Sequence, residues 1–360
     1  MRRRLLLTGS MALAIGASLC GAGGASAETI QLHVLAAQSP RMLSVGLMSK
    51  YMLPEINKRL KAKGSKYQIK WRESYAGVVA GNKEIFSAIQ DRVGDMAQVG
   101  TLFEGAKLPL SQMTFYVPFT DARLPTVLDA VSSLDKKVPA VNEAFARYHQ
   151  RVLSLMGTDS YVLVTKFPVK SIDDLKGHKL GVAGSSANWL RGTGAVPVAS
   201  NLAAYYNSLR TGVYDGVIVF ASALLPFKFY EVAPYITDIG MGAMQSSAIT
   251  INSETWKGLP PEVRDVMTDV AHDFRARLAK DAVAEADKAL GLAAKKGAKV
   301  SKLSPAERKR WADAMPNLAE EWAKKMEAKG LPARELVKGY IAALREKGTP
   351  IARDWAAGWK

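Results

Sequence analysis

The segment "SIDDLKGHKLGVAGSSANWLRGTG", residues 171–194, carries the signals that decide the fold. Ser171 is predicted as an N-cap, with Asp174 three residues later and Gly177 as the stop of one helical turn. The apolar stretch "KLGVAG" then begins a new strand, which runs into a loop and a second helix start. A strand that leads into such a loop is typical of a segment that holds a ligand.

The same alternation of strand and helix extends on both sides of this segment. Apolar residues alternate in 29–37, a helix is predicted over 43–64, and a further strand, helix and strand follow up to residue 99. After Arg151, strands and helices alternate again. This pattern predicts α/β lobes, each built on a mostly parallel sheet covered by helices.

The C-terminal third of the chain is predicted to be helical. Val263, Val266, Met267, Val270, Phe274 and Leu278 form one apolar stripe of a long helix that extends to Ala294, and Ser304 opens another helix. We expect residues 28–150 plus about 241–285 in one lobe. Residues 151–240 plus about 286–360 form the other, with crossings near 151–157 and 238–245.

Residues 1–27 are predicted to be a signal peptide cleaved near Ala27, which exports the chain to the periplasm of a bacterium. Arg2, Arg3 and Arg4 precede an apolar stretch, an order that suits general secretion and also resembles a twin-arginine signal. Cys20, the only cysteine, follows the large residue Leu19 and is expected to be lost with the signal. No later apolar run reaches the roughly 18 residues of a spanning helix.

Composition and motifs argue against several functions. The formal net charge is +16, and the tail from residue 295 holds 16 basic and 8 acidic residues without interleaved aromatics or a recognisable module, so we expect no nucleic-acid partner. His33, His149, His178 and His272 are scattered, which predicts no metal site. Nucleophile-elbow, phosphate-loop and dinucleotide motifs are missing, so we expect neither an enzyme nor a cofactor.

Polar and aromatic residues recur after the predicted strand ends. Strand ends meet at one edge of such a sheet, so these side chains are candidates for the walls of a ligand cleft, although each taken alone is also suited to packing. The candidates are Ser39, Tyr75, Thr101, Phe115, Tyr161, Asn188, Trp189 and Phe220.

Five segments in order resemble the substrate-binding proteins of tripartite ATP-independent periplasmic (TRAP) transporters, which include the C4-dicarboxylate binders. They are "AGVVAGNKEIFSAIQDRVGDM", "SIDDLKGHKLGV", "YYNSLRTGVYDG", "FYEVAPYITD" and "NSETWKGLPPEVRD". The resemblance implies a two-lobed clamshell with a long helix bracing both lobes. It also implies a small organic acid as ligand and the membrane subunits of a TRAP permease as partners. We expect a monomer.

The chain departs from that family at its carboxylate-binding positions. The family arginine in the strand after Asp-Leu-Lys-Gly is replaced by Gly181, and an arginine of sialic-acid binders by Tyr161. Where Gln-Glu-Asn-Pro is common, this chain has "VIVF", which includes Val219 and Phe220. The usual bidentate grip on a carboxylate is therefore missing.

Two explanations follow. In the first, Arg191 holds the carboxylate with help from Asn188, Gly181 clears space, and aromatic rings enclose a monocarboxylate with an aromatic or bulky apolar part. In the second, Arg191 faces solvent or pairs with a structural carboxylate, and the ligand is neutral or little charged. A binding protein that presents its ligand to a sensor kinase would have the same sequence features.

Overall fold

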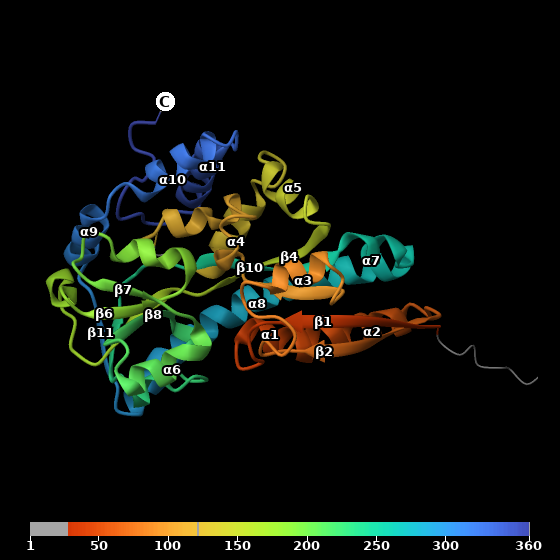
Figure 1. The fold of residues 1–360 in the computed structure, drawn as a ribbon, viewed down its shortest axis with the longest axis horizontal. Coiled ribbons are helices and arrows are strands. Elements are labelled where there is room, and N and C mark those ends of the chain that lie inside the picture. The colour runs from red at the N-terminus through yellow and green to blue at the C-terminus, as the bar shows by residue number, and fades with distance from the viewer. Residues whose placement is uncertain (1–27, 121, 360) are drawn as a thin grey trace, which may run out of the picture.

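The computed structural model describes residues 28–120 and 122–359, and the predicted signal peptide lies outside these residues. Two mixed β-sheets with flanking helices form two lobes, which lie on the two sides of the molecule in Figure 1. The predicted two-lobed α/β fold is confirmed.

The first sheet has five strands. β1 runs parallel to β2 and β3, whereas β10 runs antiparallel to β3 and β4. The sheet is therefore mixed rather than mostly parallel as predicted, because β10 returns from the second lobe in the opposite direction. In order across the sheet, the strands are β2 (Tyr67–Ser74), β1 (Glu28–Ala36), β3 (Met96–Val99), β10 (Met244–Asn252) and β4 (Gln150–Thr158).

The second sheet has six strands and is also mixed. β5 runs antiparallel to both β8 and β9, while β6 runs parallel to β7 and β8. In order, the strands are β11 (Lys299–Lys302), β9 (Tyr235–Asp238), β5 (Tyr161–Thr165), β8 (Gly216–Phe220), β6 (Lys179–Val182) and β7 (Val196–Ala199).

Helices cover the two sheets. The helix predicted over 43–64 contains a π-helical turn at Met48–Met52, just before Pro54, which has no N–H to donate to the preceding turn. The smaller helices are α1 (Leu43–Leu47), α2 (Leu53–Ala62), α3 (Ile85–Gln90), α4 (Leu124–Ser132), α5 (Ala140–Ala146), α6 (Leu202–Thr211), α7 (Ser253–Gly258), α9 (Pro305–Ala314), α10 (Leu318–Glu327) and α11 (Ala333–Glu346).

The long helix α8 (Pro261–Lys295) spans 35 residues and braces both lobes, as predicted. It packs against β4, α2 and α4 of the first lobe, and against β11 and the turn at Ala221–Ala223 in the second. The predicted apolar stripe from Val263 to Leu278 is buried in these contacts. At 1.5 Å per residue, the helix is roughly 50 Å long, enough to cross both lobes.

The observed lobe boundaries differ from the predicted ones. β4 belongs to the first sheet, so the chain crosses at Asp159 and Ser160, later than the predicted boundary at residue 151. The second crossing, at residues 239–243, falls inside the predicted range. The C-terminal tail was predicted to belong to the second lobe. Its helices α10 and α11 instead pack on the 3₁₀ helix Leu110–Tyr116 of the first lobe, and α11 also contacts α4.

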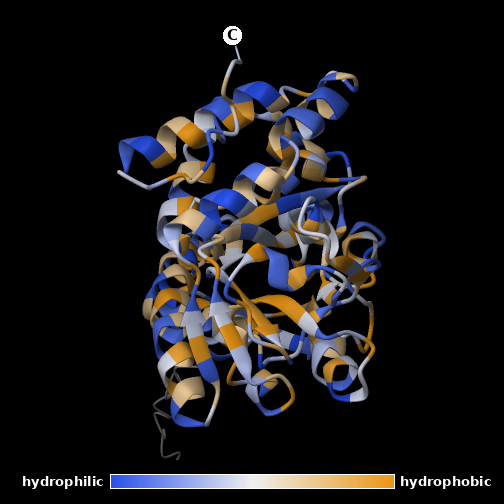
Figure 2. Ribbon diagram, turned by 90° about the vertical axis from the view of Figure 1, so that its left-hand side faces the viewer, coloured by the Kyte–Doolittle hydropathy of each residue, from blue (hydrophilic) through white to orange (hydrophobic). Residues whose placement is uncertain are grey.

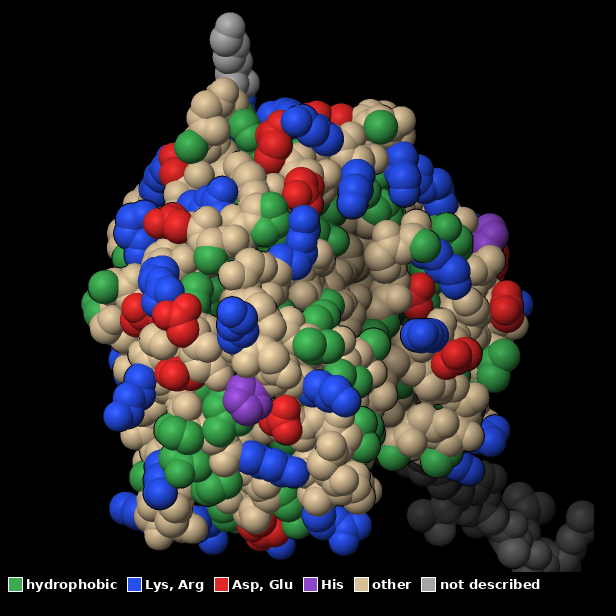
Figure 3. All heavy atoms as spheres, turned by 60° about the vertical axis from the view of Figure 1, so that its left-hand side comes forward, with side chains coloured by type: hydrophobic (Ala, Val, Ile, Leu, Met, Phe, Trp, Pro, Cys, Tyr) green, Lys and Arg blue, Asp and Glu red, His purple; other side chains and the backbone are tan. Residues whose placement is uncertain are grey.

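The core lies between the sheets and their helices. All nine residues of β10 are buried, because helices and loops cover both faces of this strand. Figure 2 shows hydrophobic residues along the inner strands and hydrophilic residues on the outward faces of the helices. On the face shown in Figure 3, Lys and Arg side chains are dispersed among Asp and Glu side chains. None of the described helices is long and apolar enough to cross a membrane.

Candidate functional site

The segment 171–184 folds as its sequence predicts. The backbone N–H groups of Lys170 and Ser171 each donate to Asp174 Oδ2 at 2.8 Å, which fixes the single turn Ile172–Leu175. Charge on Asp174 is favoured by these hydrogen bonds, so its pKa is lowered. β6 follows and pairs with β7 and β8, and Ala183 comes directly after its last residue.

A cavity of about 60 Å³, partly open to solvent, lies between the lobes next to Ala183. Both lobes supply its walls. The first contributes Gln38, Met42, Asn82, Gln98, Gly100, Leu102, Phe103, Thr158, Ser246 and Ser247, and the second contributes Tyr161, Ala183, Leu202, Tyr205, Ile218, Val219 and Phe220.

The described walls of this cavity carry no charged side chain. Their polar groups are amides and hydroxyls, of which some are already paired. Gln38 Nε2 donates to Asn82 Oδ1 at 2.9 Å, and the Thr158 hydroxyl donates to the Tyr161 hydroxyl at 3.1 Å. Burial raises the pKa of Tyr161, so its phenol stays protonated.

Two buried hydroxyls in these walls have no hydrogen-bond partner among the residues that the structure describes. They belong to Tyr205, on α6, and Ser247, on β10, and each side chain is about 2% exposed. Burial, with smaller contributions from Tyr161 and Tyr214, raises the pKa of Tyr205, so this phenol also remains a donor. Buried polar groups are normally paired, which makes these two hydroxyls candidates for ligand contacts.

A local irregularity in β10 brings two serines to the same wall. The pairing of β10 with β4 shifts between Gln245 and Ser247, so that Ser246 is an extra residue in the ladder. Successive side chains of a regular strand point to opposite faces, whereas a bulge can re-aim one of them. Ser246 and Ser247 both line the cavity for this reason.

The structure brings together part of the predicted site. Tyr161 and Phe220 line the cavity, with their rings edge to face at a centroid distance of 6.0 Å. Ser39 and Thr101 are neighbours in sequence of the lining residues but are not among them. Tyr75 is not among the lining residues either, and its hydroxyl donates to Glu73 Oε2 at 2.6 Å.

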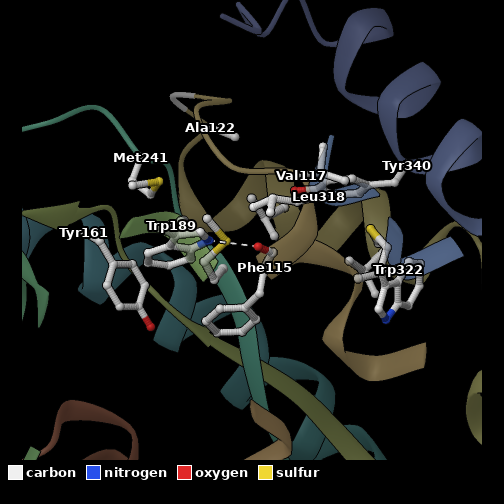
Figure 4. Packing of buried hydrophobic residues seen from close by; sticks show 14 of the residues in the cluster. Phe115, Val117, Ala122, Tyr161, Trp189, Met241, Leu318, Trp322 and Tyr340 are labelled. Carbon is white, nitrogen blue, oxygen red and sulfur yellow. Dashed lines mark hydrogen bonds between the residues drawn. The ribbon is translucent and has the colours of Figure 1, made fainter. Parts of the chain in front are cut away.

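Phe115 and Trp189 belong to the core rather than to the cavity lining. Both are fully buried, and their rings stack at a centroid distance of 5.5 Å. The Trp189 indole N–H donates to the Phe115 carbonyl at 2.8 Å, as Figure 4 shows. The prediction that these rings wall a ligand is therefore corrected: they fasten the loop after β6 to the 3₁₀ helix Leu110–Tyr116.

Arg191 and Asn188 also lie outside the cavity lining, which corrects the predicted carboxylate grip. The Arg191 guanidinium makes a bidentate ion pair with Glu321 on α10, at 2.6 and 3.1 Å. This cation lowers the pKa of the Glu321 carboxyl. Asn188 Nδ2 donates to the Ser185 carbonyl at 3.0 Å. Arg191 thus pairs with a structural carboxylate, as one part of the second explanation states.

Gly181 is explained by its neighbour Tyr214 rather than by the cavity. A Cβ at position 181 would lie 2.8 Å from Tyr214 Cζ, closer than side chains tolerate. Tyr214 is buried, and its hydroxyl forms a hydrogen bond with Ser200 at 3.2 Å. The Tyr214 ring fills the space beside Gly181. The sequence had suggested that this space is cleared for a ligand.

The sequence reasoning missed the polar walls contributed by Asn82, Gln98, Tyr205, Ser246 and Ser247. None of these residues directly follows the end of a strand, which is where a parallel sheet places its ligand-binding residues. β10 runs antiparallel, so its first residues reach the cavity, and the polar stretch "QSS" that opens this strand was a usable signal. Among residues 28–120 and 122–359, no cluster of His, Cys, Asp or Glu is arranged to hold a metal ion.

Two mixed-sheet lobes, a bracing helix and a cavity between the lobes define the class of two-lobed solute-binding proteins. The family described as "Bacterial extracellular solute-binding protein, family 7" matches residues 48–354. The chain belongs to this family, and the predicted resemblance to TRAP substrate-binding proteins is confirmed.

Relatives and solved structures agree with this assignment. The chain is 30% identical over 150 residues to a solute-binding protein of Sulfitobacter sp. (strain NAS-14.1), covering 41% of this chain and 45% of that one. It is 25% identical over 229 residues to the C4-dicarboxylate-binding periplasmic protein DctP of Vibrio cholerae, covering 61% and 66%. The chain thus spans about half to two thirds of these relatives.

Two solved structures show the same fold at low sequence identity. A TRAP solute-binding protein of Rhodoferax ferrireducens T118, in complex with copurified benzoate, has a TM-score of 0.77, with 18% identity over 89% of this chain and 98% of that one. DctP7 of Bordetella pertussis, a receptor binding pyroglutamic acid, has a TM-score of 0.74, with 19% identity over 88% and 99%.

Proposed function

We propose that this protein captures a small organic acid with an aromatic or bulky apolar part and delivers it to the membrane subunits of a TRAP permease. The observation that carries this proposal is the cavity between the lobes, whose walls combine the rings of Phe103, Tyr161, Tyr205 and Phe220 with a few uncharged polar groups. Concave, mostly apolar sites with few polar contacts are typical of small-molecule binding.

The comparisons support this class of ligand. Proteins of the same fold hold benzoate and pyroglutamic acid, which are small carboxylic acids with a ring. An aromatic ring of that size would bury its faces against Phe220 and Tyr161, which meet edge to face. Succinate or malate offers little apolar surface to such walls.

Capture would depend on movement of the lobes. Both lobes supply walls of the cavity, and the chain crosses between them at Asp159 and Ser160 and at residues 239–243. A solute that contacts both walls would stabilise the closed arrangement, because it binds that arrangement more tightly than the open one. The protein performs no chemistry in this account.

One observation favours a second candidate, a neutral or little-charged solute. The described walls carry no Lys, Arg or His, and Arg191 is engaged with Glu321. Moving an unpaired charge from water into an apolar site is costly, so a solute without a charge avoids this penalty.

Calorimetry on the mature chain tests the proposed function. We expect binding of ring-bearing acids such as benzoate, phenylpyruvate or mandelate, and weak or undetectable binding of succinate and malate. Ala183→Trp should abolish binding, because Ala183 is half-buried in the cavity wall and an indole there would fill the space. Tight binding of succinate with no response to ring-bearing solutes would contradict the proposal.

A further inference from the structure

Two residues of the cavity lining, Tyr205 and Ser247, carry buried hydroxyls without a described hydrogen-bond partner. Tyr205 lies on α6 of the second lobe, and Ser247 lies on β10 of the first, so one hydroxyl comes from each side. Both side chains are about 98% buried, and no described residue pairs with either oxygen. Leaving a buried hydroxyl unpaired is unfavourable, and a bound solute with a suitable polar group would remove that cost.

The local structure holds each hydroxyl in place. The Tyr205 ring packs edge to face against Tyr214 and Phe229, at centroid distances of 6.2 and 6.1 Å. Ser247 follows the bulge in β10, and its own carbonyl accepts a hydrogen bond from Gln245 Nε2 at 3.1 Å. A polar atom held by a rigid shell loses little entropy when it binds a ligand.

No basic side chain belongs to the described lining around these two hydroxyls. Arg191 is bound to Glu321, and the Tyr214 ring occupies the space beside Gly181 where a longer side chain would extend. Lys83 follows the lining residue Asn82 in sequence, but it is exposed and is not part of the lining. The described walls therefore offer hydrogen bonds without a countercharge.

We infer that Tyr205 and Ser247 are the two ligand anchors, one from each lobe, and that they hold the polar groups of the solute through uncharged hydrogen bonds. This inference rests on the proposed function, because it concerns the same cleft. Its consequence is that the site does not require a carboxylate. An arginine grip strongly favours an acid over its amide, whereas hydroxyl donors and acceptors serve both.

Two conservative variants test the anchors by calorimetry. The probes are acid and amide pairs of one skeleton, namely benzoate and benzamide, phenylacetate and phenylacetamide, and pyroglutamate and its amide; the pair that binds most tightly is followed. We expect Tyr205→Phe and Ser247→Ala each to weaken binding about tenfold, which corresponds to about 1.4 kcal/mol. The matched control is Tyr214→Phe, which alters a neighbouring ring outside the lining and should leave the affinity unchanged.

Thermal unfolding of the same variants separates an anchor from a structural hydroxyl. Because neither hydroxyl has a described partner, Tyr205→Phe and Ser247→Ala should leave the midpoint of the ligand-free protein unchanged or raise it. Tyr214→Phe removes a hydrogen bond to Ser200 and should lower it. A fall in the midpoint for both anchor variants without a change in affinity would overturn the assignment.

The acid and amide pairs test the lack of a countercharge. An amide that binds no more than tenfold more weakly than its acid supports the inference. A preference for the acid of more than tenfold would overturn it, and loss of that preference in Lys83→Gln would identify the cation responsible.

The variant Ala183→Trp distinguishes failure of this inference from failure of the proposed function. If it abolishes binding while both anchor variants leave the affinity unchanged, only this inference fails; if binding survives it, the proposed function fails.

Discussion

Trp189 and Tyr205 are both large, fully buried aromatic residues of the second lobe, yet their polar atoms differ. The Trp189 indole donates to the Phe115 carbonyl at 2.8 Å, and its own carbonyl accepts from the Trp311 indole at 2.8 Å. The Tyr205 hydroxyl has no partner in the described chain. A buried aromatic whose polar groups are paired stabilises the fold, whereas an unpaired one beside a cavity is available to a ligand.

The largest effect on stability should come from Trp189, whose polar groups are paired. Trp189→Ala removes a fully buried ring from a stack and deletes a hydrogen bond between two segments. We expect the free energy of unfolding to fall by about 3–5 kcal/mol, the usual cost of truncating a buried Trp or Phe. Chemical denaturation measures it. A loss below 1 kcal/mol together with a large loss of ligand affinity would show instead that Trp189 serves the cavity.

Asp159 extends the comparison to a charged group with one unpaired oxygen. Its Oδ1 accepts from the Ser222 N–H at 3.1 Å, Oδ2 has no described partner, and burial raises its pKa to about 6. Because the pKa is higher in the folded than in the unfolded chain, the free energy of unfolding should fall as pH rises from about 4 to 6 and level off above 6.

Asp159→Asn is the variant that isolates this contribution. We expect the difference between the two unfolding profiles to change by about 1–3 kcal/mol across that pH range, since one pKa unit corresponds to about 1.4 kcal/mol. Denaturant titrations at fixed pH values measure it, and the subtraction removes the other carboxyls. Parallel profiles for the two proteins would show that the pKa of Asp159 is not raised in the folded state.

Gly181→Ala tests whether Tyr214, rather than a ligand, occupies the space beside residue 181. The added methyl would meet the Tyr214 ring at 2.8 Å, so we expect a loss of about 1–3 kcal/mol of stability. In a Tyr214→Leu background the penalty should shrink, which a double-mutant cycle detects. An alanine that leaves stability intact but abolishes ligand binding would place residue 181 in the cleft.

Arg191→Ala should have the smallest effect. Its ion pair with Glu321 is partly exposed, with 43% and 41% of the two side chains accessible, so solvent screens it. We expect a loss of less than about 1 kcal/mol in stability and no change in ligand affinity. Calorimetry with the tightest-binding probe checks the second part. A tenfold loss of affinity would show that Arg191 binds the carboxylate of the ligand.

The fold was readable from the sequence because its signals are local. The Ser171 and Asp174 turn, the Gly212 end of α6 at φ 78° and the stripe on α8 all follow from spacing and residue type. The strand directions were not readable in this way. A single-sequence pattern does not reveal that β10 returns antiparallel, and this fact decides that Ser246 and Ser247 reach the cavity.

The site was predicted only in part for the same reason. Tyr161 and Phe220 were predicted because they stand at strand ends, and the structure pairs them where β5 begins and β8 ends. The sequence analysis also named Phe115, Trp189 and Arg191. Their polar groups are paired with residues more than 70 positions away in the chain. Such long-range pairing is set by tertiary packing, and composition near a strand end does not report it.

A crystal structure of the protein with its tightest-binding solute tests the central claim most directly. The account predicts the solute between the lobes, with its polar groups within hydrogen-bonding distance of the Tyr205 and Ser247 hydroxyls and with Arg191 still bound to Glu321. A solute whose carboxylate is paired with Arg191 or Lys83, while both hydroxyls remain without a partner, would contradict it.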